Sequence, residues 1–136
     1  MLMKHIGYIT TLLFLFCGCF AIAQERDPRF KTLDSLLDAG KPDQALKLGL
    51  QLSESRYRDA DAWLALAFCY EDLGENQKCL AAIDRALELK PNSEITYALY
   101  FQKADCYSRL LELKPAMVWC EKFLKYRPGN GEGLNL

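Results

Sequence analysis

The sequence predicts an all-α protein, a solenoid of about three helix-turn-helix hairpins. Three observations lead to this prediction: apolar residues recur at three- and four-residue steps, Gly and Pro follow them at regular distances, and residues repeat at a constant offset. Such a hairpin buries its apolar face only against a neighbour, so about three are needed for a stable fold. The 136 residues, 51% hydrophobic and 26% charged, have the composition of one folded domain.

The first segment, residues 1–23, has the order of a secretory signal peptide. A basic start at Lys4 precedes an apolar run, and Ala21 and Ala23 are the small residues that a signal peptidase requires. We expect cleavage after Ala23 and a periplasmic or secreted protein, exported as in Gram-negative bacteria and not inserted in the membrane after cleavage. An uncleaved anchor is one alternative. Lipid attachment to Cys19 is a weaker one, because the residues before it fit the lipoprotein pattern poorly.

The mature chain would contain no histidine, because His5, the only one, lies in this segment. This excludes Ser-His-Asp and Cys-His nucleophiles and any zinc site with a His ligand. Without Lys4 the chain has 16 Lys and Arg against 18 Asp and Glu, so it lacks the basic field that nucleic acid requires. It also contains no Gly-rich phosphate loop and no metal motif. We therefore expect a protein that is not an enzyme and has no cofactor.

The first hairpin, about residues 26–59, is the least regular. Gly40 and Ala45 align with Gly74 and Cys79 at one common offset, so both are in register with the hairpin that follows. The segment lacks the aromatic residues and the closing Pro of that second hairpin.

The second hairpin, about residues 60–93, defines the pattern. Gly74 supplies the left-handed backbone at which helices commonly end, and Pro91 ends the second helix. Each helix has one buried stripe, formed by Trp63, Leu66, Ala67 and Tyr70 in the first helix and by Cys79, Leu80, Ile83, Ala86 and Leu87 in the second.

The third hairpin, about residues 97–130, repeats the second at a constant offset, with Tyr100 in place of Trp63. The identities at this offset are Ala104, Cys106, Tyr107 and Pro128. Three additional residues before the third hairpin predict either a longer connection or an earlier start of its first helix. Residues 131–136 are a tail or the start of a further repeat. Three alternatives follow: the tail is disordered, the last helix has an open apolar face, or the chain is a fragment of a longer array.

These residues resemble the tetratricopeptide repeat family, whose 34-residue unit has the pattern W-x2-L-G-x2-Y, then A-x3-F, then a late Pro. The second hairpin has small residues, Ala67 and Cys79, at the Gly and first Ala positions of that pattern. The resemblance covers nearly all of residues 24–130 and implies a right-handed solenoid. It assigns structural roles to Trp63, Leu66, Ala67, Tyr70, Gly74, Ala86, Pro91, Ala104, Tyr107 and Pro128.

The resemblance also implies a concave groove lined by the first helix of each hairpin. The positions carried over for partner binding are Asp61, Leu64, Phe68, Glu71, Asp72, Phe101, Asp105 and Arg109, with Phe30, Asp34 and Asp38 from the first hairpin. This aromatic floor with an acidic rim suits a protein or peptide segment that has apolar side chains and some Lys or Arg. The alternative is that the acids form a solvated face and that the aromatic rings pack between repeats.

Two adjacent acids in this set raise the question of acid-base catalysis. Neighbouring residues on a helix point about 100° apart, so Glu71 and Asp72 do not face each other across a substrate. We interpret them as a solvated pair.

Four cysteines follow the signal segment: Cys69, Cys79, Cys106 and Cys120. None has the C-x-x-C spacing of zinc or thioredoxin-like sites. They occupy positions where the family has small or apolar residues, which favours buried thiols. If a disulfide forms, we expect it between Cys79 and Cys106, because the second helix of one hairpin lies beside the first helix of the next.

Taken together, the resemblance implies a non-catalytic adaptor or scaffold of the bacterial cell envelope that binds a partner segment in the groove. The alternatives are an N-terminal sensor or regulatory module of a larger protein, or a membrane-tethered lipoprotein assembly factor. The sequence leaves the oligomeric state open.

Overall fold

The computed structural model describes residues 26–126, so the expected signal segment, Pro128 and residues 131–136 lie outside the described residues. Within this range the chain forms helices and no strand. The helices are α2 (Pro28–Asp38), α3 (Pro42–Ser55), α4 (Ala60–Asp72), α5 (Asn76–Glu88), α6 (Ser93–Arg109) and α7 (Leu113–Lys125). No helix of this range has both the length and the apolarity needed to cross a membrane.

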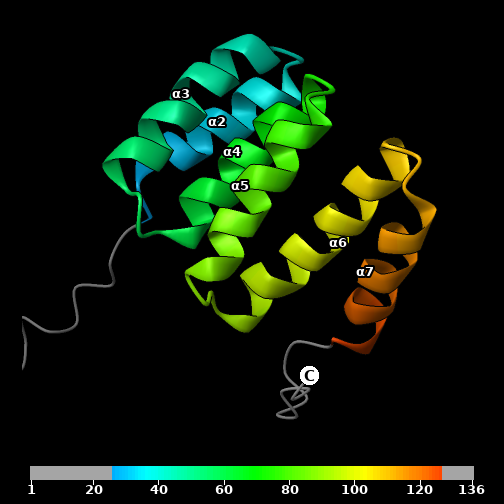
Figure 1. Cartoon of the computed structure of the whole chain (residues 1–136). Coiled ribbons are helices and arrows are strands. Elements are labelled where there is room, and N and C mark those ends of the chain that lie inside the picture. The colour runs from blue at the N-terminus through cyan, green and yellow to red at the C-terminus, as the bar shows by residue number, and fades with distance from the viewer. Residues whose placement is uncertain (1–25, 127–136) are drawn as a thin grey trace, which may run out of the picture.

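The helices form three hairpins, α2/α3, α4/α5 and α6/α7, which stack in chain order (Figure 1). Contacts join α2 to α4 and α4 to α6, whereas no contact within residues 26–126 joins α3 to α5 or α5 to α7. The first helices of the hairpins are therefore the closely spaced inner layer, and the second helices are the outer layer. The predicted all-α solenoid is confirmed.

The helices start at residues with suitable chemistry. Asp59 accepts a hydrogen bond from the backbone N–H of Asp61 at the start of α4 (3.0 Å), and Asn92 does the same for Ile95 in α6 (3.0 Å). Because Asn92 caps α6, this helix begins at Ser93, ahead of the expected start of the third hairpin at position 97. The additional residues of that hairpin therefore extend its first helix.

The first helix of each hairpin ends in the same backbone turn. The N–H of Glu75 bonds to the carbonyl of Tyr70, and the N–H of Gly74 bonds to that of Glu71 (both 2.9 Å). Equivalent bonds close α2 and α6. The turn places its central residue in the left-handed region, with φ of 65° at Gly40, 70° at Gly74 and 59° at Leu111. The third hairpin thus has a leucine where the other two have glycine.

The core consists of two clusters. One joins α2, α3 and α4 around Phe30, Leu33 and Leu52, and the larger one joins α4, α5 and α6 around Ile83 and Leu99. α7 contains no buried residue. The number of buried residues therefore falls toward the last hairpin.

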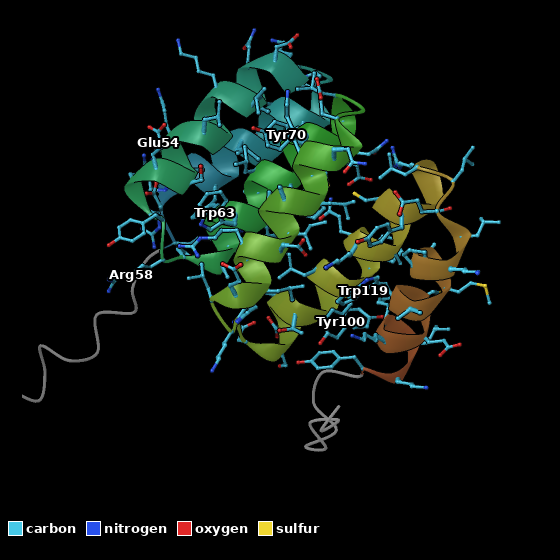
Figure 2. The ribbon with its side chains drawn as sticks, viewed as in Figure 1. Glu54, Arg58, Trp63, Tyr70, Tyr100 and Trp119 are labelled. Carbon is cyan, nitrogen blue, oxygen red and sulfur yellow. The ribbon has the colours of Figure 1, made fainter. Side chains whose placement is uncertain are left out.

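The positions expected to be structural are placed as follows. Leu66, Ala67 and Ala86 are buried, and Gly74 forms the turn described above. The remaining described positions, Trp63, Tyr70, Pro91, Ala104 and Tyr107, are half-buried. Trp63, labelled in Figure 2, donates its indole N–H to the carbonyl of Tyr57 (2.9 Å).

Candidate functional site

One row of predicted groove residues occupies the same repeat position in the three inner helices: Phe30, Leu64 and Phe101. Their side chains are 2%, 7% and 57% exposed, respectively. Helix α4 contacts α2, and helix α6 contacts α4. The first contact covers Phe30 and the second covers Leu64. Leu64 is therefore a core residue, contrary to the prediction that it faces a partner. Phe101 is open because no described helix follows α7.

The next row contains Asp34, Phe68 and Asp105. Phe68 is 39% exposed, and Asp34 and Asp72 are exposed beside it on the inner layer. Asp72 follows Phe68 by one turn of α4, and Asp34 occupies the position of α2 that corresponds to Phe68. Burial raises the pKa of the Cys69 thiol to about 12, and the charges of Asp72 and Asp34 contribute to that rise. Phe68 thus lies among carboxylates.

We call Asp34, Asp38, Phe68 and Asp72 the acidic inner face. Within residues 26–126, none of its three carboxylates forms an ion pair. All three are exposed. This face therefore has unneutralised negative charge around one exposed ring.

Three other predicted groove residues form a contact between hairpins. Glu71 of α4 accepts hydrogen bonds from the amide of Gln102 and from Arg109 (2.9 Å), both on α6. Arg109 also pairs with Asp105 (2.7 Å). Burial raises the pKa of Glu71, while the bonds from Gln102 and Arg109 act against that rise. Glu71 is therefore an internal tie between the second and third hairpins and not a solvated rim residue.

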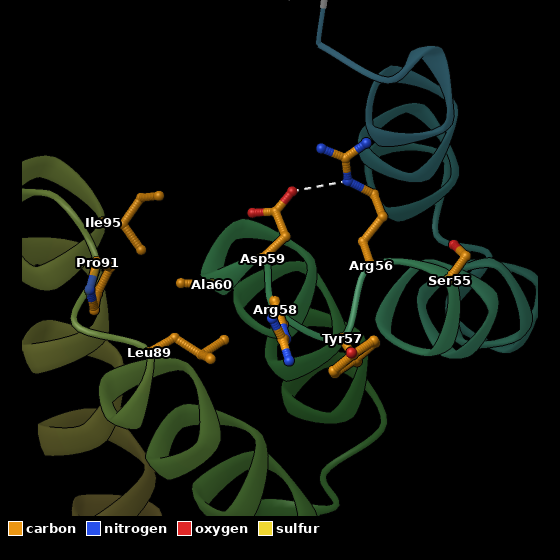
Figure 3. A pocket seen from close by; sticks show the side chains of 9 residues that line it. All are labelled: Ser55, Arg56, Tyr57, Arg58, Asp59, Ala60, Leu89, Pro91 and Ile95. Atoms are coloured by element: carbon orange, nitrogen blue, oxygen red, sulfur yellow. Dashed lines mark hydrogen bonds and ion pairs between the residues drawn. The ribbon is translucent and has the colours of Figure 1, made fainter.

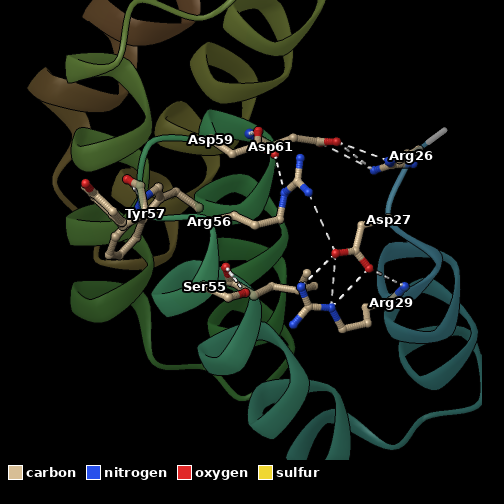
Figure 4. A network of polar contacts seen from close by, with 10 residues as sticks. Arg26, Asp27, Arg29, Ser55, Arg56, Tyr57, Asp59 and Asp61 are labelled. Atoms are coloured by element: carbon tan, nitrogen blue, oxygen red, sulfur yellow. Dashed lines mark hydrogen bonds and ion pairs between the residues drawn. The ribbon is translucent and has the colours of Figure 1, made fainter. Parts of the chain in front are cut away.

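Asp61, the remaining predicted residue, belongs to a polar network at the start of the described chain (Figure 4). It pairs with Arg26 (3.1 Å), and its pKa is raised by burial. Nearby, Asp27 binds Arg29 (2.7 Å), and this hydrogen bond lowers the pKa of Asp27 to about 2. Arg56 lies between Asp27 (3.7 Å) and Asp59 (2.8 Å). These charges are already paired and join the first hairpin to the second.

A hollow of about 630 Å³ lies between the α3–α4 and α5–α6 connections (Figure 3). Its lining residues are Ser55, Arg56, Tyr57, Arg58, Asp59, Ala60, Leu89, Pro91 and Ile95. The guanidinium of Arg56 is bound by Asp59, and that of Arg58 lies 5.4 Å from the ring centre of Tyr57. The hollow therefore offers no converging set of free polar groups.

A second hollow, of about 470 Å³, lies between α6 and α7 and is mainly apolar. We call it the terminal slot. Its lining residues are Phe101, Ala104, Asp105, Ser108, Leu113, Ala116, Met117, Cys120, Phe123 and Leu124. Leu113, Met117 and Leu124 are each more than 60% exposed. An apolar surface of this kind on a folded protein commonly marks an interaction site.

The cysteines divide into two kinds. Cys69, Cys79 and Cys106 are buried, whereas Cys120 is exposed, contrary to the prediction for it. The reason is the same as for Phe101: no described helix covers this side of α7. The Cys79 and Cys106 thiols are hydrogen-bonded to each other (2.9 Å), and this bond and burial raise the pKa of Cys79. The two thiols are free and adjacent, so their disulfide stays a prediction.

One feature of the third hairpin was absent from the sequence-based set. Lys103 is only 7% exposed, contacts Asp84, and lies with its ammonium 4.0 Å from the ring centre of Trp119. Its position in the repeat corresponds to Leu66 of the second hairpin, so a lysine in a core position was the available signal. The open apolar face of α7, by contrast, was one of the alternatives expected from the sequence.

The three stacked hairpins define the protein as a helical repeat solenoid. Residues 60–93, which contain α4 and α5, match the family model described as tetratricopeptide repeat. The match supports a tetratricopeptide repeat at these residues, and such repeats generally mediate binding to other proteins or peptides. No curated protein sequence matches the chain.

Proposed function

We propose that the protein is a non-catalytic adaptor that binds a segment of another protein on its acidic inner face. The observation that carries the proposal is the exposed ring of Phe68 among Asp34 and Asp72, which form no ion pair within residues 26–126. An aromatic anchor gives affinity when a ligand buries it, and surrounding charges select the ligand and speed association. The segment that fits has an apolar side chain flanked by Lys or Arg.

The location that we propose is the cell envelope. Its support is the order of the segment before Gln24: a basic start, an apolar run, and Ala21 and Ala23. Intact-mass measurement of the protein recovered from its host should show loss of residues 1–23. A retained N-terminus contradicts export by cleavage, and a diacylglycerol group on Cys19 indicates a lipoprotein instead.

Partner binding is tested by capture from an envelope extract with the purified protein as bait. Phe68→Ala should weaken retention of the partner by about tenfold or more, because it removes the only exposed aromatic ring of the acidic inner face. Tyr57→Ala is the matched control, since Tyr57 is also an exposed aromatic residue but lies in the α3–α4 connection. Equal retention by the Phe68 and Tyr57 variants would contradict the proposal.

The charge requirement needs a separate measurement. Asp34→Lys with Asp72→Lys should slow association and reverse its dependence on salt, with a smaller effect on the lifetime of the complex. Circular dichroism should show unchanged helicity, because both carboxylates are exposed.

A further inference from the structure

The terminal slot corresponds to a surface of the second hairpin that a helix already covers. In the repeat register, Met117 and Cys120 correspond to Leu80 and Ile83. Leu80 is 7% exposed and Ile83 is 0% exposed, because α6 packs on them in one cluster that includes Leu99. The slot therefore has the form of a site for a helix.

The outer face of α7 has the spacing of a surface that pairs with another helix. Leu113, Met117, Cys120 and Leu124 follow one another at steps of four, three and four residues, and all are exposed. Such spacing forms the apolar seam of two-helix interfaces. A different stripe of α7 already packs on α6, since the ring of Phe123 lies 4.5 Å from that of Tyr97 between centres. The seam is thus additional to the packing within the hairpin.

Charges beside the seam favour a second α7 in the antiparallel direction. Lys114 and Glu121 each follow a seam residue by one position, so they lie on the same flank. In an antiparallel pair, Lys114 of each helix lies near Glu121 of the other, which gives two contacts of opposite charge. A parallel pair would place these side chains beside the other flank, which holds Ala116 and Phe123. Within residues 26–126, the only ion pair of Glu121 is a long, exposed contact with Lys125 (3.8 Å).

The opposite end of the described stack does not fit the slot as well. In the register that aligns the first two hairpins, Lys31, Thr32 and Ser35 of α2 occupy the positions that Ala65, Leu66 and Cys69 occupy in α4. These α2 residues are exposed, whereas the α4 residues are buried. Stacking copies head to tail would place polar side chains in an apolar slot. A two-fold pairing of slots places apolar surface against apolar surface in both copies.

We propose that two copies of this chain pair through their terminal slots. In the pair, α7 of each copy lies antiparallel to α7 of the other and occupies the groove between that copy's α6 and α7. The contact is isologous, so both slots are filled and assembly stops at a dimer. The acidic inner faces remain open, and the dimer offers two of them.

The test is sedimentation velocity of the purified protein over about a hundredfold range of concentration. The wild-type chain should show a reversible monomer–dimer equilibrium. Lys114→Glu alone and Glu121→Lys alone each place like charges together twice, and each should raise the dissociation constant about tenfold. The double variant Lys114→Glu with Glu121→Lys should restore pairing, and a mixture of the two single variants should form heterodimers. Lys47→Glu, at an exposed position of α3, is the charge control.

A second variant tests the apolar seam. Met117→Glu with Leu124→Glu should leave the chain monomeric at every concentration, with circular dichroism unchanged because both side chains are exposed. Phe68→Ala should dimerise as the wild type does, so failure of partner binding and failure of pairing are distinguishable.

Two outcomes would overturn the proposal. One is a wild-type chain that stays monomeric throughout the range. Another is a dimer that the seam and charge variants leave unchanged, which places the interface elsewhere. If the wild type is monomeric, protection of the Cys120 thiol from an alkylating reagent would show that other residues of the same chain cover the slot. Free reaction of this thiol would indicate that the slot binds a helix of a different protein.

Discussion

At the scale of single residues, equivalent positions of the repeat have different roles in the three hairpins. Glu71 binds Gln102 and Arg109 across a hairpin boundary, whereas Asp72 beside it is exposed. Lys103 occupies a core position and is compensated by Asp84 and by the ring of Trp119. A charged residue on these helices can therefore tie two hairpins together, as Glu71 does, or stay exposed, as Asp72 does, and only its contacts distinguish the two.

Asp27 provides a residue-scale prediction about acid. Its pKa is about 2, below the ordinary 3.8, because Arg29 donates a hydrogen bond to it. The folded state therefore favours the ionised form of Asp27 more than the unfolded state does. This contribution to stability is lost as the pH falls from about 4 to about 2. Asp27→Asn should lower the melting temperature at pH 5, and its difference from wild type should shrink over that interval.

Asp27→Asn has to be compared with the wild type because protonation of other carboxylates changes the stability in the opposite direction. Burial raises the pKa of Asp61 and of Glu71, so protonation of these two groups at falling pH favours the folded state. Asp43→Asn, an exposed change in the first turn of α3, is the control. A difference between Asp27→Asn and wild type that stays constant down to pH 2 would contradict the assignment.

At the scale of helices and turns, the turn of the third hairpin has the same backbone geometry as the turns of the other two, but with a leucine in place of glycine. Leu111 has the left-handed backbone of Gly40 and Gly74 and is 81% exposed. A Cβ destabilises this conformation, and little burial is lost when the side chain is removed. Leu111→Gly should therefore raise the free energy of unfolding by about 1 kcal/mol in urea titrations. Gly74→Ala should lower it by a similar amount, and a destabilised Leu111→Gly would show that this leucine has a packing role.

The helices and turns could be predicted from the sequence, but the contacts that bury or expose their side chains could not. The stripes of α4 and α5 and the glycine at Gly74 were predictable because periodicity and turn chemistry are local. The burial of Leu64 was not, because it depends on the helix that packs above it in the stack. Cys120 shows the converse: it has the pattern of a core position, but no described helix covers it. Pattern alone does not tell a core stripe from a surface that awaits a second molecule.

At the scale of the whole molecule, each hairpin contacts only its neighbours in the stack, so stability is distributed along the chain. α4 lies in the middle and contains seven buried residues, whereas α7 lies at the end of the described stack and contains none. α2 is also terminal but buries Phe30 and Leu33. The stack is thus asymmetric, because the helix without a buried residue lies at the slot where we propose that two copies meet.

This asymmetry predicts a gradient of hydrogen exchange. At low protein concentration the amides of α7 should be protected at least about thirtyfold less than those of α4, with α2 between them, because opening α7 exposes little apolar surface. Raising the concentration should increase protection in α7, and Met117→Glu with Leu124→Glu should abolish that increase while α4 stays unchanged. Hydrogen exchange followed by mass spectrometry resolves the three helices. If α7 exchanges as slowly as α4 in the dilute monomer, the hairpins open as one cooperative unit and the end of the stack is not weak.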